Sequence, residues 1–206
     1  MTERIALIDY GAGNLRSVHN ALMAAGAHAI DVTADADAVR DADRIVLPGV
    51  GAFAACMDGL SALPGMVEAL HGAAIDKARP FLGICVGMQL MADRGEEHGT
   101  HQGLGWIPGT VKPLASDDPR LKIPHMGWND VTPQGAPPLI EPGEAYFLHG
   151  YHVALADPAD AYAMTDHGGP ATAAIGRGTM IGVQFHPEKS QKYGLDFLSR
   201  FLDWKP

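Results

Sequence analysis

Residues 81–91 have the sequence FLGICVGMQLM, in which a strand-like apolar run passes directly into a helix-compatible run. Cys85 lies at the junction, with Gly83 two residues before it and Gly87 two residues after it. Glycines at this spacing permit a sharp strand-to-helix turn, which holds the side chain between them at the top of a sheet. The stretch therefore predicts a buried strand and a candidate nucleophile at its carboxyl end.

Similar apolar runs alternate with helical patterns on the amino-terminal side of this stretch. Strands are predicted over residues 4–10, 28–33, 44–47 and 81–85, and helices over 14–25 and 66–74. The alternation predicts an α/β fold with an open, mostly parallel sheet flanked by helices. Ligands of such sheets bind beyond the carboxyl ends of the strands, so we expect the site at that edge.

The carboxyl-terminal half has a different pattern. Residues 103 to about 142 are rich in proline and glycine and contain short β-like pieces at 110–114 and 128–132. Further strands are predicted over 144–155 and 180–185, followed by a helix over 193–204. We therefore expect an added antiparallel β portion. No linker or repeat divides the chain, which predicts a single domain over residues 1–206.

Composition excludes several classes of function. The 206 residues carry a net charge of -9, which offers no electrostatic footprint for nucleic acid. No apolar run is long enough to span a bilayer, and the start lacks a signal-peptide layout, so we expect a cytoplasmic protein with no membrane partner and with reduced thiols. The ten histidines are scattered without metal-binding motifs. We therefore expect no metal site and no cofactor.

A base and an orienting group for Cys85 are available in the segment QFHPE at 184–188. His186 follows a predicted strand, and Glu188 lies two residues later, where its carboxylate can reach one ring nitrogen while the other faces the thiol. Two plainer interpretations remain open. Cys85 could be a buried small hydrophobe at a strand end, as Cys56 is expected to be in its helix, and the HPE segment could be a surface turn.

Acyl transfer also needs backbone N–H donors for the oxyanion. The loop at residues 48–51 follows a predicted strand, and its glycines let the backbone approach a substrate. We expect the donors to be the N–H groups of Val50 and Val86, with Gly51 in the same loop. A plain turn is the alternative, because proline and glycine favour turns in any case.

These segments together resemble a known family. GICVGMQ at 83–89 and VQFHPEKS at 183–190 resemble the class I glutamine amidotransferases, which have a flavodoxin-like fold. Within that family, the chain is most similar to the glutaminase subunits of imidazole glycerol phosphate synthase. This narrower resemblance covers nearly the whole chain and rests on IDYGAGNLRSV (8–18), LPGVGAF (47–53), EEHGTHQGLGWIPGTV (96–111), IPHMGWN (123–129) and YFLHGYHV (146–153).

The resemblance implies a reaction and a set of substrate contacts. Cys85 would attack the side-chain amide of glutamine, and a glutamyl thioester would form and be hydrolysed to glutamate, with release of ammonia. The residues implied in holding glutamine are Gly49, Gln89, Glu97, His149, Gly150 and Tyr151. Two positions depart from the family pattern: Val86 replaces a usual leucine, and Gly150 replaces a common serine or threonine.

The resemblance also implies a partner. In this family a cyclase subunit, a (β/α)8 barrel, pairs with the glutaminase as a heterodimer. It uses the ammonia to make imidazole glycerol phosphate and aminoimidazole carboxamide ribotide for histidine biosynthesis. Asn14 and Lys189 flank the predicted site and are candidate docking or gating residues. Asn14 could instead cap a helix, and Lys189 could simply be solvated.

Two other functions remain open at this point. The chain could be a class I glutaminase subunit that serves a different synthase, because the most general motifs are shared across the family. It could also be a non-catalytic scaffold subunit that keeps the fold.

Overall fold

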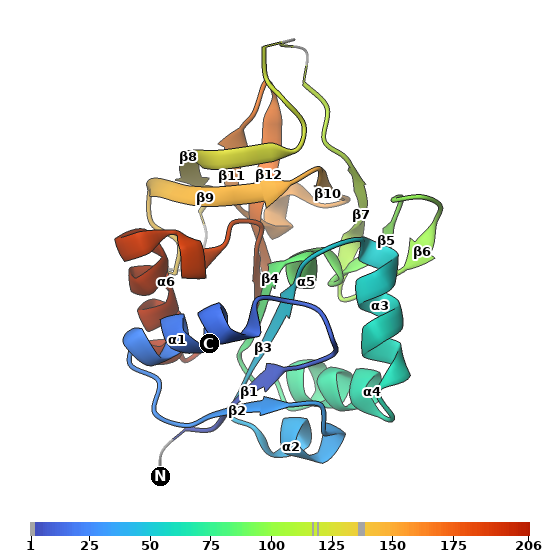
Figure 1. Cartoon of the computed structure of the whole chain (residues 1–206), viewed down its shortest axis with the longest axis vertical. Helices are drawn as coiled ribbons and strands as arrows, with labels where there is room; N and C mark the ends of the chain where they lie inside the picture. The colour runs from blue at the N-terminus through green and yellow to red at the C-terminus, as the bar shows by residue number, and fades with distance from the viewer. Residues whose placement is uncertain (1–2, 117, 119, 136–138) are drawn as a thin grey trace.

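The computed structural model describes residues 3–116, 118, 120–135 and 139–206. Its centre is a nine-stranded sheet in the order β2-β1-β3-β4-β13-β12-β11-β8-β9, beside a four-stranded sheet in the order β10-β7-β5-β6 (Figure 1). The strands of the large sheet are β1 (Ile5–Ile8), β2 (Ile30–Thr33), β3 (Arg44–Gly49), β4 (Phe81–Cys85), β8 (His125–Pro133), β9 (Gly143–His149), β11 (Ala161–Asp166), β12 (Pro170–Arg177) and β13 (Met180–Val183). Those of the small sheet are β5 (Ala92–Gly95), β6 (His101–Gln102), β7 (Ile107–Pro113) and β10 (Tyr151–Leu155).

Helices cover the parallel strands on both faces. They are α1 (Leu15–Ala24), α2 (Ala36–Asp41), α3 (Phe53–Ala62), α4 (Met66–His71), α5 (Val86–Gln89) and α6 (Gln191–Asp203), with a π-helical turn over Gly72–Asp76 and 3₁₀ turns over Pro158–Asp160 and Pro187–Lys189. Figure 1 shows α1 beside α6 on one side of the sheet and α3 beside α4 on the other. This coverage confirms the predicted fold class.

The five strands from β2 to β13 run parallel, and four of them are buried along their whole length. Burial on both faces explains why their sequences are continuous apolar runs rather than alternating ones. Gly49 pairs with Cys85, and Val183 pairs with Ile84, so the carboxyl ends of β3, β4 and β13 meet at one point of the sheet edge. The predicted location of the site depends on this alignment.

The other four strands are antiparallel, as the added β portion predicts. Burial alternates along β8 and β9, because one face of this part packs inward while the other is open. Met126 and Trp128 of β8 are among the most exposed large hydrophobic residues of the described chain.

Two predicted elements differ from the structure, and two strands of the large sheet were not predicted. The strand predicted over 144–155 is broken at Gly150 into β9 and β10, which belong to different sheets. The helix after Cys85 spans four residues, because the chain turns at Leu90 and Met91 into β5. Strands β11 and β12, which supply two of the nine positions in the sheet, were not predicted. The short helix and the break both come from tertiary packing.

The helices α3 and α4 are apolar because they pack on the sheet. Their buried side chains are Phe53, Cys56, Leu60, Met66, Ala69 and Leu70. Within the described residues, no single helix is long and apolar enough to cross a membrane, although Phe53–Ala62 and Met66–Asp76 together pass that test as a pair bent by 97°.

Candidate active site

Cys85 occupies a strained backbone conformation between β4 and α5. Its φ of 55° and ψ of -111° lie outside the regions that residues with a side chain normally adopt. The two flanking glycines make the turn possible. A Cβ at Gly83 would lie 2.6 Å from the carbonyl oxygen of Gly87, and a Cβ at Gly87 would lie 1.9 Å from that of Leu47. The sharp turn expected from the sequence is therefore present, and close backbone packing holds it.

His186 and Glu188 lie just beyond the neighbouring strand β13. The ring Nδ1 of His186 is 2.9 Å from Oε1 of Glu188, and the two side chains are only 3% and 1% exposed. Backbone contacts hold the histidine in place, since its N–H donates to the carbonyl of Tyr146 and its own carbonyl accepts from the hydroxyl of Ser190. The carboxylate thus orients the ring through Nδ1 and leaves Nε2 as the nitrogen available for proton transfer.

The protonation of His186 is set by its two charged neighbours. Burial is the largest single influence and disfavours the imidazolium, but the hydrogen bonds and negative charges of the Cys85 thiolate and the Glu188 carboxylate together outweigh it and raise the pKa of His186 to about 10. With this raised pKa, the ring that has taken the thiol proton holds it at neutral pH, opposite a thiolate. The pair His186 and Glu188 therefore has the chemistry of a general base with its orienting group.

Three groups surround the Cys85 sulfur. Besides His186, the carbonyl oxygen of Leu148 lies 3.9 Å away and Nε2 of Gln184 lies 3.7 Å away. The helix α5 is a single turn, so few peptide dipoles are aligned toward the sulfur. The dipole of α5 therefore contributes little to stabilising a thiolate at Cys85.

The loop at residues 48–51 is held by two buried side chains. The Tyr10 hydroxyl donates to the carbonyl of Pro48 at 2.7 Å, and the Cys56 thiol donates to the carbonyl of Val50 at 3.3 Å. Burial raises the pKa of both Tyr10 and Cys56, so both keep the protons that they donate. Cys56 is therefore more than core filling, since it and Tyr10 anchor the peptides on either side of the Gly49–Val50 bond.

A cavity of about 350 Å³ opens above Cys85. It is lined by Val50, Gly51, Cys85, Val86, Gln89, Glu97, Pro124, Leu148, His149, Gly150, Tyr151, His186 and Lys189. Most of the residues singled out in the sequence are thus brought together at one place. Within the described chain, Gly49, Glu188 and Asn14 are outside this lining: Gly49 lies beneath it against Gly87, and Glu188 lies behind His186.

Comparisons with known proteins identify the family. A family model described as "Glutamine amidotransferase class-I" matches residues 6–203. The chain belongs to the class I glutamine amidotransferases. It is also similar to proteins named imidazole glycerol phosphate synthase subunit HisH: it is 62% identical to that of Zymomonas mobilis, with 98% of this chain and 96% of the relative covered, and 56% identical to that of Rhodospirillum rubrum, with 98% and 100% covered.

Solved amidotransferase structures share the fold at much lower identity. One described as a glutamine amidotransferase is 14% identical, with a TM-score of 0.75, 96% of this chain and 97% of that chain covered. A chain of PurLQS from Thermotoga maritima is 19% identical, with a TM-score of 0.69, 98% of this chain and 99% of that chain covered. The narrower membership, in the HisH family, rests on the much higher identities to the curated relatives.

The residues implied in substrate binding have unequal freedom in this amidotransferase. Nε2 of Gln89 donates to the carbonyl of Tyr151 at 3.1 Å and to Oε1 of Gln184 at 3.0 Å, so only its own carbonyl oxygen is left for a ligand. One carboxylate oxygen of Glu97 accepts from the N–H of Phe53 at the start of α3, at 2.7 Å. Substrate binding by these residues stays a prediction, and it is restricted to the side-chain oxygen of Gln89 and the second carboxylate oxygen of Glu97.

The turn between β9 and β10 forms the opposite wall. Nδ1 of His149 is 2.9 Å from the carbonyl of Tyr151, and burial lowers the pKa of His149 to about 3, so the ring is neutral. A Cβ at Gly150 would meet only ordinary contacts, with Ile123 and Pro124 at 3.9 Å. The packing around this position therefore does not require glycine in place of the common serine or threonine.

The two candidate docking residues lie in different surroundings. Lys189 is exposed at the rim of the cavity, and its Nζ lies 5.9 Å from the centre of the Tyr146 ring. Asn14 precedes α1 without a side-chain capping bond, so the structure does not support the capping alternative. Their role in docking or gating stays a prediction.

Sequence reasoning missed Gln184, Leu148 and Pro124. Gln184 belongs to the segment QFHPE, but only the pairing of Val183 with Ile84 places it beside Cys85. Leu148 reaches the sulfur through its backbone carbonyl, which no side-chain pattern reveals. The available signal was the position of Gln184 one residue beyond a strand that neighbours the elbow.

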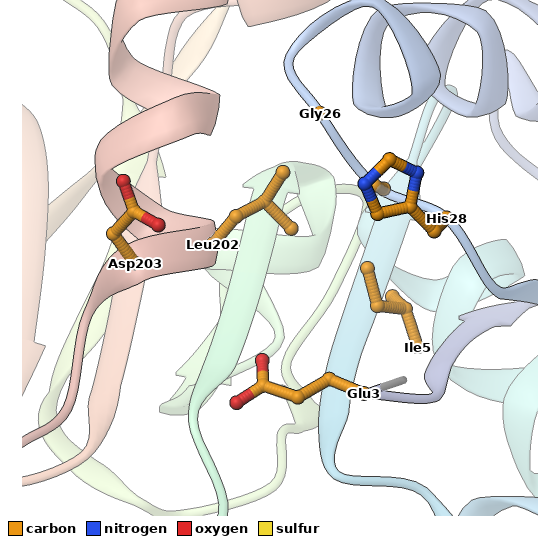
Figure 2. Close-up of a pocket in the computed structure, with 7 residues that line it drawn as sticks. Glu3, Ile5, Gly26, His28, Leu202 and Asp203 are labelled. Carbon is orange, nitrogen blue, oxygen red and sulfur yellow. The ribbon is translucent and has the colours of Figure 1, made fainter. Parts of the chain in front are cut away.

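A larger cavity of about 590 Å³ lies elsewhere, beside the amino end of β1. Figure 2 shows Glu3, His28 and Asp203 around it, from the chain start, the α1–β2 connection and the end of α6. It lies at the amino edge of the parallel strands, away from the edge where such sheets bind ligands. The described residues include no group of three or more His, Cys, Asp or Glu side chains arranged to hold a metal ion.

Proposed function

We propose that the chain hydrolyses glutamine at Cys85, with His186 as general base and Glu188 as its orienting group. Family membership supplies the reaction class: the chain is the glutamine amidotransferase, or glutaminase, subunit of imidazole glycerol phosphate synthase in histidine biosynthesis. The observation that carries the residue assignment is the convergence of the strained cysteine and the buried His186–Glu188 pair, 2.9 Å apart, at one sheet edge.

The proposed reaction has two stages. His186 takes the thiol proton and holds it while the sulfur attacks the side-chain amide carbon, and the proton is then delivered to the leaving nitrogen as ammonia departs. Water next attacks the glutamyl thioester with His186 again as base, which releases glutamate and restores the thiol. In both stages the oxyanion would accept hydrogen bonds from the N–H groups of Val50 and Val86. Val86 begins α5, so its N–H has no acceptor within that helix.

The substrate would lie along the cavity between the loop at 48–51 and the turn at 149–151. The carbonyl oxygen of Gln89 and the free carboxylate oxygen of Glu97 can accept from the ammonium group of glutamine. Backbone groups of the 149–151 segment complete the site. A volume of about 350 Å³ is at the lower end of the range for small-molecule sites, which suits an amino acid.

The released ammonia needs an acceptor that is protected from water. Free ammonia becomes mostly ammonium in neutral water and is no longer a nucleophile, so a docked synthase benefits the reaction. We propose a heterodimer with the cyclase subunit, a (β/α)8 barrel, near the cavity rim where Lys189 is exposed. The single domain, the cytoplasmic location and the absence of nucleic-acid and membrane partners stay predictions from the sequence.

A glutaminase assay tests the proposal on the chain alone, with the cyclase subunit, and with the cyclase subunit holding its own ligand. Cys85→Ala should lower glutamate release at least a thousandfold in the complex. Cys56→Ser is the matched control, because it keeps a donor for the Val50 carbonyl, and it should stay within about threefold of the unmodified chain.

Glutamate release that persists in the Cys85→Ala complex would remove Cys85 from the mechanism. Labelling with a glutamine-analogue electrophile distinguishes a catalytic subunit from a non-catalytic scaffold. If no label reaches Cys85 in the liganded complex, the chain is a scaffold rather than a catalyst. A stable complex with a synthase other than the cyclase would overturn the partner assignment.

A further inference from the structure

Gln184 is a fully buried polar residue that contacts the candidate nucleophile. Its side chain is 0% exposed and lies between Gln89 and Cys85. The backbone around it is fixed, since the N–H of Gln184 donates to the carbonyl of Ala173 at 2.8 Å. A buried amide needs partners for both of its ends, and here one of those partners is the reacting sulfur.

The direction of the Gln184 amide follows from a chain of hydrogen bonds that begins at the backbone. The carbonyl of Tyr151 can only accept, so Gln89 must present its amide nitrogen to it, at 3.1 Å. The same nitrogen then donates its second hydrogen toward Gln184, which must present its oxygen, at 3.0 Å. The Gln184 nitrogen is thereby turned toward Sγ of Cys85, at 3.7 Å.

We propose that Gln184 is a further catalytic residue, whose Nε2–H group stabilises the thiolate of Cys85, and that Gln89 positions it. The inference rests on the proposed role of Cys85 as nucleophile. It assigns to Gln89 a function separate from substrate binding, which uses the other end of its side chain.

A donor at this place fills a need that the rest of the site leaves open. The Leu148 carbonyl can accept from a thiol but offers nothing to a thiolate, and α5 is too short to supply a strong dipole. His186 donates to the sulfur only while it is protonated. Gln184 carries no charge and donates whatever the state of His186, so it stabilises the thiolate both before the attack and when the thiolate leaves the hydrolysed thioester. Hydrogen bonds to an ionised partner are about twice as strong as neutral ones.

The test is the pH dependence of Cys85 alkylation by iodoacetamide, followed on the Cys85 peptide by mass spectrometry. Gln184→Leu should move the half-maximal pH upward by about one unit, so that alkylation below the midpoint slows about tenfold and recovers at higher pH. Gln184→Glu, close in shape, should move it upward by at least as much, because a carboxylate would repel the thiolate. Gln89→Leu should give a smaller upward shift.

Thr172→Val is the matched control. It removes one buried hydrogen bond, from the Thr172 hydroxyl to the carbonyl of Val153 at 2.9 Å, without contacting the sulfur. Its midpoint should match that of the unmodified chain. A purely structural role for Gln184 predicts lower stability with an unchanged midpoint in both Gln184 variants, and that result would overturn the inference. If Gln184→Leu does not fold, the alkylation midpoint of Gln184→Glu tests the inference.

The alkylation readout separates this inference from the proposed function. It reports on the sulfur whether or not Cys85 reacts with glutamine. Unchanged midpoints together with an inactive Cys85→Ala complex would remove only the role of Gln184. Full glutaminase activity of Cys85→Ala would remove the proposed nucleophile, and with it the catalytic meaning of any shift.

Discussion

The parallel and antiparallel parts of the nine-stranded sheet differ in burial and in what they contribute to the site. Strands β1, β3, β4 and β13 are buried along their entire length, whereas burial alternates along β8 and β9. The parallel part supplies Cys85, His186 and the loop at 48–51, while the turn after β9 supplies the facing wall at 149–151. The candidate chemistry is therefore on the more closely packed part, and the part with an open face forms the outer wall.

This difference has a physical origin. Parallel strands all end at the same edge, so groups that follow them converge, and helices on both faces restrict their movement. Antiparallel strands can leave one face uncovered, and here that face carries Met126 at 64% exposure and Trp128 at 46%. Substitutions in the parallel part should therefore lower the free energy of unfolding much more than substitutions in the antiparallel part.

The largest expected difference is between two glycines, one from each part. Gly87→Ala places a Cβ 1.9 Å from the carbonyl oxygen of Leu47, so the backbone of the elbow must shift, and we expect a loss of more than about 3 kcal/mol in the free energy of unfolding. Gly150→Ala meets only contacts at 3.9 Å and should stay within about 0.5 kcal/mol. Urea unfolding measures both. Equal losses would contradict the comparison.

The next difference concerns the pH dependence of stability. The pKa of His149 is lowered to about 3, chiefly by burial, so its contribution to stability is complete above pH 6.5 and is lost as the pH falls toward 3, by about 1.4 kcal/mol per unit within that window. His186, with its pKa raised to about 10, has the opposite sign: its contribution is complete below pH 6.5 and is lost as the pH rises toward 10.

Unfolding free energies measured from pH 4 to pH 10 test both signs. His149→Gln should reduce the slope on the acid side and leave the alkaline side as it is, because His125 and His152, whose pKa values are also lowered by burial, contribute the rest of the acid slope. His186→Gln should flatten only the alkaline side. An acid slope that is unchanged in the His149 variant would contradict the predicted contribution of His149.

A smaller effect is expected from the anchors of the loop at 48–51. Tyr10→Phe leaves the buried carbonyl of Pro48 without its donor, which should cost about 1–3 kcal/mol in stability. It should also lower glutamate release roughly tenfold, a fraction of the effect of losing an oxyanion donor. Tyr193→Phe is the control, since its hydroxyl donates to the carbonyl of Glu141 at an exposed position, where water can replace it. A Tyr10 variant with normal activity would show that the loop does not depend on this anchor.

The smallest effect is expected on the open face. Met126→Ala should change the free energy of unfolding by less than about 0.5 kcal/mol, because the side chain is mostly in water. Met88→Ala, at a side chain that is 0% exposed in the parallel part, should lower the free energy of unfolding by roughly 2–5 kcal/mol. Thermal or urea unfolding of the isolated chain is the measurement. A large loss at Met126 would mean that the open face is packed in the free protein.

Much of the parallel part was predictable from local patterns. Continuous apolar runs at 4–10, 44–47 and 81–85 predicted buried strands, which the structure has at Ile5–Ile8, Arg44–Gly49 and Phe81–Cys85, and glycines at 83 and 87 predicted the elbow. The prediction was poorer in the antiparallel part. Strand β11 is only half-buried and has a weak pattern, whereas β12 is buried but consists mostly of small residues and lacks a run of large apolar side chains. The break at Gly150 was not predictable because it depends on which sheet each half joins.

The sequence by itself determined the parallel scaffold, the elbow at Cys85 and the candidate partners His186 and Glu188, because these depend on residue types at short spacing. Only the tertiary structure decided what surrounds the sulfur. Gln184 reaches Cys85 through strand register, Leu148 through a backbone carbonyl, and Tyr10 and Cys56 hold the loop from two different elements. Such contacts join residues far apart in the chain, and no local pattern encodes the distance between them.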